Sequence, residues 1–209
     1  MEIAIVKYNA GNIYSVESAL RRLGVVPRLT DDAETLRHAD GVLFPGQGEA
    51  RGAMDYLRNH GLDEVIRSLR QPVLGICIGQ QLLCRHSEEG DTDCLGVFDV
   101  DVRRFQPTLH EDKIPAMGWN EIRQLQSPLM EGLHEGDFVY FVHSYYVPVC
   151  EHTIAVADYV LPYSAAIHKD NFFATQFHPE KSGRVGEQIL SNFLRIASGH
   201  QSHPISTAP

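Results

Sequence analysis

One cysteine of this 209-residue chain stands in a context that is typical of nucleophiles. Cys77 lies within Gly75-Ile76-Cys77-Ile78-Gly79-Gln80-Gln81, between an apolar segment and an amphipathic one. The spacing matches the strand–nucleophile–helix turn of G-x-S-x-G hydrolases, with sulfur in place of oxygen. Such a turn is tight and needs its glycines, because side chains there would collide with neighbouring elements. For an isolated motif, a buried structural cysteine beside two packing glycines is an equally good interpretation.

A thiol nucleophile needs a base and a group that orients the base. His178 ends a predicted strand, and Glu180 follows two residues later, after Pro179. Residues two apart in an extended segment project to the same side, so Glu180 can bind one imidazole nitrogen while the other faces Cys77. A surface loop after a strand is the alternative interpretation of His-Pro-Glu. The pattern predicts a Cys–His–Glu triad.

A negatively charged oxygen forms when a thiolate attacks an amide, and it needs N–H donors. The N–H of Ile78, which follows the nucleophile, is one candidate. Another comes from Gly46-Gln47-Gly48, because two glycines let the peptide between them rotate at little steric cost. On its own this segment fits a plain strand-to-helix turn equally well. A phosphate site is disfavoured, since no Lys-Ser or Lys-Thr follows.

These segments need a framework that brings them together. Up to about residue 86, short apolar runs alternate with amphipathic segments. The runs predict strands at 3–6, 25–29 (an edge strand, because it contains Pro27), 41–44 and 72–76. Helices are predicted at 12–23 (capped by Asn12), 32–38 (capped by Asp31 or Asp32), 50–58, 62–69 and 80–86. Such alternation indicates an α/β fold with a mostly parallel sheet and helices on both faces.

In the second half of the chain, the pattern of hydrophobic residues predicts mainly strands. It predicts strands at 97–105, 118–124, 138–147, 153–160, 163–168 and 172–177, and a final helix at 182–197. We therefore expect a β-rich C-terminal half, mixed or antiparallel. One domain is expected over residues 1–198, with a disordered polar tail at 199–209.

Composition excludes several classes of protein. The chain is 43% hydrophobic and 22% charged, with a formal net charge of -9, which argues against nucleic acid or an anionic membrane as partner. No signal peptide and no apolar run of ~20 residues is seen, so a cytoplasmic location is expected. Three further cysteines without a C-x-x-C pattern are read as buried and structural: Cys84, Cys94 and Cys150. The ten other histidines show no metal-ligand spacing, so no metal or cofactor is expected.

Taken together, these segments resemble the class I, or triad, glutamine amidotransferases. That family has a flavodoxin-like α/β domain, and Cys77, His178 and Glu180 match its catalytic motif. The resemblance implies that glutamine is hydrolysed beside Cys77, with Ile78 and residues 46–48 around the oxyanion. It also implies that three further residues bind the glutamine: Gln81, Ser144 and Tyr145.

Four strings are similar to one branch of this family: residues 8–16, 115–120, 140–145 and 176–182. In that branch the glutaminase is a separate chain, and a (β/α)8-barrel cyclase subunit consumes the ammonia. The resemblance therefore implies a heterodimer with such a cyclase. Three alternatives remain open: another triad glutaminase of a pyridoxal phosphate or nucleotide pathway, a γ-glutamyl hydrolase, and a non-catalytic module of the same fold.

Overall fold

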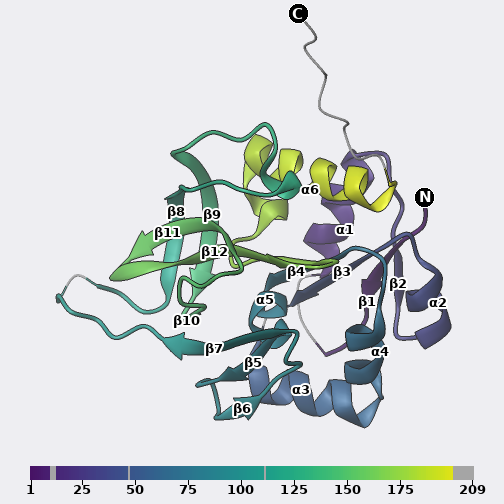
Figure 1. Cartoon of the computed structure of the whole chain (residues 1–209), viewed down its shortest axis with the longest axis horizontal. Coiled ribbons are helices and arrows are strands. Elements are labelled where there is room, and N and C mark those ends of the chain that lie inside the picture. The colour runs from purple at the N-terminus through teal and green to yellow at the C-terminus, as the bar shows by residue number, and fades with distance from the viewer. Residues whose placement is uncertain (10–12, 47, 111, 200–209) are drawn as a thin grey trace, which may run out of the picture.

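A seven-stranded sheet lies at the centre of the computed structural model, which describes residues 1–9, 13–46, 48–110 and 112–199 (Figure 1). In spatial order its strands are β11 (Thr153–Tyr159), β12 (Leu161–Lys169), β13 (Phe172–Thr175), β4 (Val73–Cys77), β3 (Gly41–Gly46), β1 (Ile3–Val6) and β2 (Arg28–Thr30). The strands from β2 to β13 are parallel, and β12 and β11 continue the sheet antiparallel. The parallel part has the strand order of flavodoxin-like sheets.

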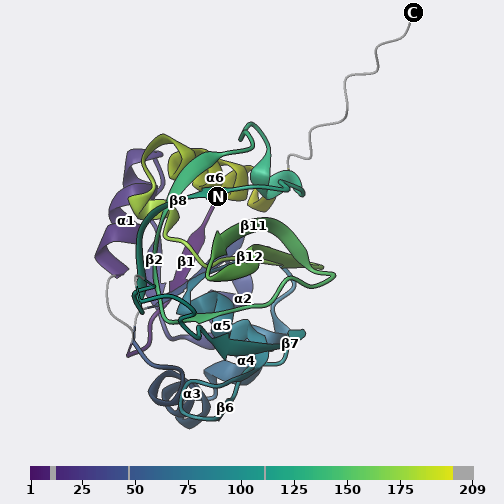
Figure 2. The same cartoon turned by 90° about the vertical axis from the view of Figure 1, so that its left-hand side faces the viewer.

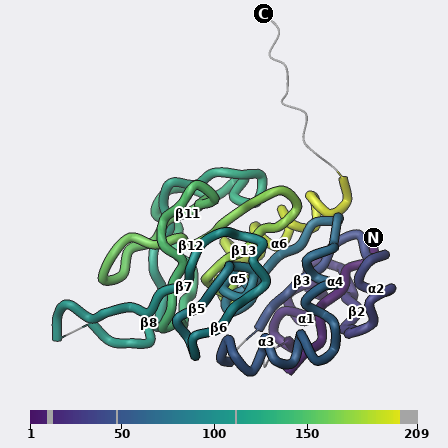
Figure 3. Tube along the Cα trace, turned by 60° about the horizontal axis from the view of Figure 1, so that its bottom comes forward, coloured from purple at the N-terminus to yellow at the C-terminus, as the bar shows by residue number. Residues whose placement is uncertain are grey.

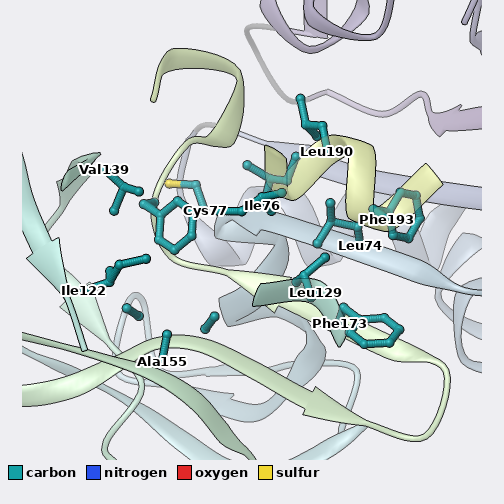
Figure 4. Packing of buried hydrophobic residues seen from close by; sticks show 14 of the residues in the cluster. Leu74, Ile76, Cys77, Ile122, Leu129, Val139, Ala155, Phe173, Leu190 and Phe193 are labelled. Atoms are coloured by element: carbon teal, nitrogen blue, oxygen red, sulfur yellow. The ribbon is translucent and has the colours of Figure 1, made fainter. Parts of the chain in front are cut away.

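Helices cover both faces of this sheet (Figure 2). On one face lie α1 (Ile13–Arg22) and α6 (Gly183–Ala197), and on the other α2 (Ala33–His38), α3 (Ala50–Asn59), α4 (Leu62–Ser68) and α5 (Ile78–Leu83). Figure 4 shows the face covered by α1 and α6, where Leu74 and Ile76 of β4 pack near Leu190 and Phe193 of α6. Because both faces are buried, the central strands are continuous apolar runs.

Two smaller sheets are built from the middle of the chain. One has the order β10 (Tyr145–Tyr146), β7 (Phe98–Arg104), β5 (Cys84–Ser87) and β6 (Thr92–Asp93), and the other pairs β8 (Ala116–Ile122) with β9 (Asp137–His143) antiparallel. Short 3-10 helices lie at η1 (Pro128–Met130) and η2 (Pro179–Lys181). The connection from β7 to β8 extends away from the rest of the chain (Figures 1 and 3).

The predicted α/β class, the parallel sheet and the β-rich second half are confirmed, and so is the edge position of β2. The helix predicted at 80–86 is wrong beyond Leu83. Cys84–Ser87 is instead strand β5, because it pairs with β7, a contact that the local hydrophobic pattern does not encode. The strand predicted at 138–147 is two strands, since β9 pairs with β8 whereas β10 pairs with β7.

Of the two residues predicted to cap α2, Asp31 and Asp32, it is Asp32 that caps the helix. Its side chain accepts a hydrogen bond of 2.8 Å from the Thr35 N–H. Three other expectations lie outside the described residues: the Asn12 cap, the placement of Gln47 and the disorder of residues 200–209. Over the part of the chain that the structure describes, no helix is long and apolar enough to cross a membrane.

Candidate active site

The candidate nucleophile lies on a strained strand-to-helix turn. Cys77 ends β4 with φ 57° and ψ -109°, and α5 begins at the next residue. A Cβ on Gly79 would lie 1.9 Å from the Phe44 carbonyl oxygen, and one on Gly75 would lie 2.9 Å from Leu83 Cδ1. Both glycines are therefore required by close packing, as the motif predicted. Strained backbone of this kind concentrates at functional sites.

The Cys77 side chain borders a cavity, although it also contacts the core (Figure 4). Only 7% of the residue is exposed, and its Sγ lies 3.8 Å from Nε2 of Gln176. The cavity has a volume of about 320 Å³ and is bordered by His178 as well as Cys77. An open cavity beside a thiol gives a small ligand access to the sulfur.

His178 and Glu180 form a buried pair at η2. Nδ1 of His178 donates a hydrogen bond of 2.7 Å to Oε1 of Glu180, and both side chains are 2% exposed. Burial alone lowers the pKa of His178, but the Cys77 sulfur and the Glu180 carboxylate together raise it to about 10. Nε2 of His178 is buried and has no hydrogen-bond partner among the described residues. This nitrogen is thus free to exchange a proton within the cavity.

The position of His178 is fixed through β9. The His178 N–H donates to the Tyr140 carbonyl at 2.9 Å, and the Ser182 hydroxyl donates to the His178 carbonyl at 2.6 Å. The same hydroxyl accepts from the Tyr140 N–H at 3.0 Å. These bonds fix the backbone of His178, and the bond from Nδ1 to Glu180 orients its ring.

Two of the predicted oxyanion residues, Gly48 and Ile78, border the same cavity, and Gly46 lies beside Cys77 in the sheet. Gly46 pairs with Cys77 across β3 and β4, and Gly48, at φ 131°, borders the cavity together with Ile78. Ile78 opens α5, so its N–H belongs to the first turn, where a helix supplies no acceptor. A Cβ on Gly46 would lie 1.9 Å from the Tyr8 hydroxyl, which leaves glycine as the residue that fits.

The predicted glutamine-binding residues also border the cavity: Gln81, Ser144 and Tyr145. The amide nitrogen of Gln81 donates to the Tyr145 carbonyl at 3.1 Å and to Oε1 of Gln176 at 2.9 Å. Both of its N–H donors are thereby used, so its oxygen is the atom left for a ligand.

Two residues at the cavity escaped the sequence analysis, namely Glu89 and His143. Glu89 is half-buried, and burial raises the pKa of its carboxyl against the opposing effect of a 2.9 Å hydrogen bond from the Ala50 N–H. It lies in the charged string Glu88-Glu89-Gly90-Asp91, which reads as a solvated loop. His143 lies in an apolar strand and reads as an ordinary core histidine. His143 lies within the family-like string 140–145, but nothing in that string assigns it a role, and Glu89 lies outside all four such strings.

Comparison with known proteins places this geometry in a family. The family model for glutamine amidotransferase class-I matches residues 4–197. The HisH subunit of imidazole glycerol phosphate synthase from Bacteroides thetaiotaomicron is 63% identical over 196 residues, which cover 94% of this chain and 100% of that protein. The HisH subunit from Escherichia coli K12 is 43% identical over 198 residues, with the same coverage.

Solved structures agree on the fold. A glutamine amidotransferase from Thermotoga maritima aligns with a TM-score of 0.62 at 16% identity, covering 98% of this chain and 86% of that one. Within the described residues, no three histidine, cysteine or acidic side chains are grouped as metal ligands. The chain belongs to the class I glutamine amidotransferases and groups among them with the HisH subunits of imidazole glycerol phosphate synthase.

Proposed function

We propose that this chain is the glutaminase subunit of an imidazole glycerol phosphate synthase in histidine biosynthesis. It hydrolyses glutamine to glutamate and ammonia and passes the ammonia to a separate (β/α)8-barrel cyclase subunit. The cyclase then makes imidazole glycerol phosphate and AICAR. The observation that carries the proposal is the buried His178–Glu180 hydrogen bond at a cavity bordered by Cys77. The names of relatives that match nearly the whole chain support the choice of pathway.

Charge around the cavity fits free glutamine. Glu89 is the one carboxylate that borders the cavity within the described residues, and it suits the α-ammonium group of an amino acid. Ser144 and Tyr145 line the wall formed by the end of β9 and the start of β10, where they bind the amino acid end of the substrate. The side-chain oxygen of Gln81, which makes no hydrogen bond within the described residues, accepts one from the substrate.

The reaction proceeds by covalent catalysis. The Cys77 proton passes to Nε2 of His178, which gives a thiolate beside a positively charged imidazole, as the raised pKa of His178 favours, and Sγ then attacks the side-chain amide carbon of glutamine. The N–H groups of Ile78 and of the 46–48 segment hold the resulting oxyanion. His178 returns the proton to the leaving nitrogen, the C–N bond breaks and ammonia departs, which leaves a γ-glutamyl thioester. Water then gives a proton to His178 and adds to the thioester carbon, and the thiolate leaves as glutamate forms.

A face for the cyclase lies beside this site. Three large apolar side chains on β8 and β9 are exposed: Met117 by 70%, Trp119 by 56% and Phe138 by 54%. The same two strands lead to the site, because β9 ends at His143 and its Tyr140 carbonyl binds His178. Clustered exposed apolar groups mark interaction surfaces. The β8–β9 face is therefore the surface proposed to dock the cyclase.

The test combines the chain with the cyclase of the same organism and the ribonucleotide that the cyclase consumes. We expect the complex to form imidazole glycerol phosphate from glutamine and also from ammonium salts. In Cys77→Ala, synthesis from glutamine falls by about 10³-fold or more, because no nucleophile remains, while synthesis from ammonium salts persists.

Other results would contradict the proposal. Loss of both activities in Cys77→Ala, with the complex intact, would show that Cys77 has a different role. Hydrolysis of γ-glutamyl peptides by the chain alone, with no stimulation by the cyclase, would favour a γ-glutamyl hydrolase.

A further inference from the structure

His143 carries a buried polar atom that the mechanism above does not use. It ends β9, is 5% exposed and borders the active-site cavity. Its Nδ1 lies 2.7 Å from the Tyr145 carbonyl oxygen, which can only accept, so Nδ1 carries the proton. Nε2 of the neutral ring is then a bare acceptor, and it is buried with no hydrogen-bond partner in the described part of the chain. A buried acceptor without a donor is costly, which indicates that a ligand supplies one.

The ring stands between two cavities. Its centroid lies 5.5 Å from that of Phe141 and 5.2 Å from that of Tyr163, and both of these rings line a second cavity of about 220 Å³. Met117 and Trp119 of the proposed docking face border that second cavity. His143 therefore borders the cavity at Cys77 and packs against two rings that line the second cavity, beneath the β8–β9 face.

The surroundings keep this imidazole uncharged. Burial and the positive charge at His178 lower the pKa of His143, and the bond to the Tyr145 carbonyl raises it; the net result is a pKa of about 4. The other groups packed on the ring are aromatic: Phe105, Phe141 and Tyr163. A neutral acceptor of low basicity attracts N–H donors but has no proton to give to a base such as ammonia. It can bind ammonia without converting it to ammonium, which is not a nucleophile.

We propose that Nε2 of His143 accepts a hydrogen bond from the ammonia released at Cys77 and directs it toward the cavity beneath the β8–β9 face. This inference rests on the proposed function, which supplies the ammonia. No covalent bond is made or broken at His143, so its role is to hold a product and reduce its escape to solvent.

Two substitutions separate the acceptor from the structural bond. In His143→Asn, the side-chain amide N–H can replace Nδ1–H at the Tyr145 carbonyl, but nothing occupies the place of Nε2. In His143→Gln, the longer side chain can place its oxygen near the position of Nε2, while the bond to Tyr145 is lost. Each variant thus keeps the function of one ring nitrogen and loses that of the other.

The measurement is the ratio of glutamate to imidazole glycerol phosphate formed by the full complex from glutamine. We expect a ratio near one for the wild-type complex, and a ratio raised by about fivefold in His143→Asn, the effect of one ordinary hydrogen bond. His143→Gln keeps a ratio near one. Synthesis from saturating ammonium salts checks that each variant complex is assembled.

Three results would overturn the inference. A ratio near one in His143→Asn would show that Nε2 does not hold ammonia, and if glutamate formation itself slowed, Nε2 would be holding the hydrolytic water instead. A raised ratio in both variants would show that ammonia is lost because the structure is altered, and not because the acceptor is missing. If the wild-type complex forms no imidazole glycerol phosphate from glutamine but does so from ammonium salts, the proposed glutaminase function itself fails, a result distinct from a leak confined to the variants.

Discussion

Nδ1 of His178 donates a hydrogen bond of 2.7 Å to Oε1 of Glu180, and both side chains are almost completely buried. Water cannot compete for this bond, so the carboxylate fixes which ring nitrogen carries a proton. The other nitrogen, Nε2, is left without a partner among the described residues and shares a cavity with Cys77. The orientation of the imidazole thus depends on a carboxylate two residues away, and its charge depends on that carboxylate together with the Cys77 sulfur.

The first prediction replaces this carboxylate. Glu180→Gln keeps the volume of the side chain but removes the negative charge that stabilises the imidazolium formed during catalysis. We expect kcat for glutamine hydrolysis by the complex to fall by about 10²- to 10⁴-fold, as for the orienting acid of other triads. Glutamate release measures the effect, and synthesis from ammonium salts, which does not need the triad, is the control. A kcat that stays within tenfold of wild type would show that Glu180 does not orient the base.

The second prediction concerns the turn at Cys77. In Gly79→Ala, the new Cβ would lie 1.9 Å from the Phe44 carbonyl oxygen, so the backbone must move. We expect the free energy of unfolding to drop by about 3 kcal/mol and glutamine hydrolysis to be lost, since overpacking displaces the turn. Urea unfolding and a glutaminase assay provide the two measurements.

A matched glycine gives the control for this substitution. A Cβ on Gly52, within helix α3, would meet Glu49 Oε1 at 3.5 Å, an ordinary contact. Gly52→Ala should therefore preserve activity and raise the free energy of unfolding by about 0.5–1 kcal/mol through helix propensity. If both variants lost stability and glutamine hydrolysis equally, the close contact of Gly79 in the turn would not be the cause of the loss.

The sequence was most informative where function and packing share one local pattern. Gly75 and Gly79 flank Cys77 because strand, turn and helix meet there, so the motif predicted the elements and the reason for the glycines. It failed at Cys84–Ser87, where pairing with β7 overrides a helical pattern. Nor could it find His143, because a histidine in an apolar strand reads as core until its neighbours are known. The approach of His178 to Cys77 needs the parallel pairing of β13 with β4, which no local pattern contains.

The third prediction follows from the buried, neutral state of His143. The pKa of His143 is lowered from 6.5 to about 4 in the folded chain. Between pH 4 and pH 6.5 the unfolded chain therefore binds a proton at this residue that the folded chain does not bind. The stability from this group is complete above pH 6.5 and is lost as the pH falls toward 4. Relative to His143→Asn, which cannot titrate, wild type should lose about 3 kcal/mol across this window.

Urea unfolding of both proteins at several pH values measures this difference. Titrating groups that do not contact His143 are common to both chains and cancel in the comparison. Parallel stability curves for the two proteins would show that His143 is not held neutral by burial.

The fourth prediction tests the β8–β9 face. Trp119 is 56% exposed, and its ring lies 6.1 Å from that of Tyr140, whose carbonyl binds the His178 N–H. Because large aromatic side chains dominate binding at interfaces, Trp119→Ala should raise the Kd for the cyclase by about 30-fold. Its free energy of unfolding should change by less than about 1 kcal/mol, since much of the side chain already contacts water.

Val26→Ala is the control for this face, because Val26 is 69% exposed and lies next to β2 at the opposite edge of the main sheet from β11. Calorimetric titration of each variant with the cyclase gives the two Kd values, and we expect no change for Val26→Ala. An unchanged Kd for Trp119→Ala would place the cyclase on another surface. A weakened complex that still couples glutamate to product one to one would show instead that docking strength and ammonia transfer depend on different residues, which would leave the role of His143 to be judged by its own variants.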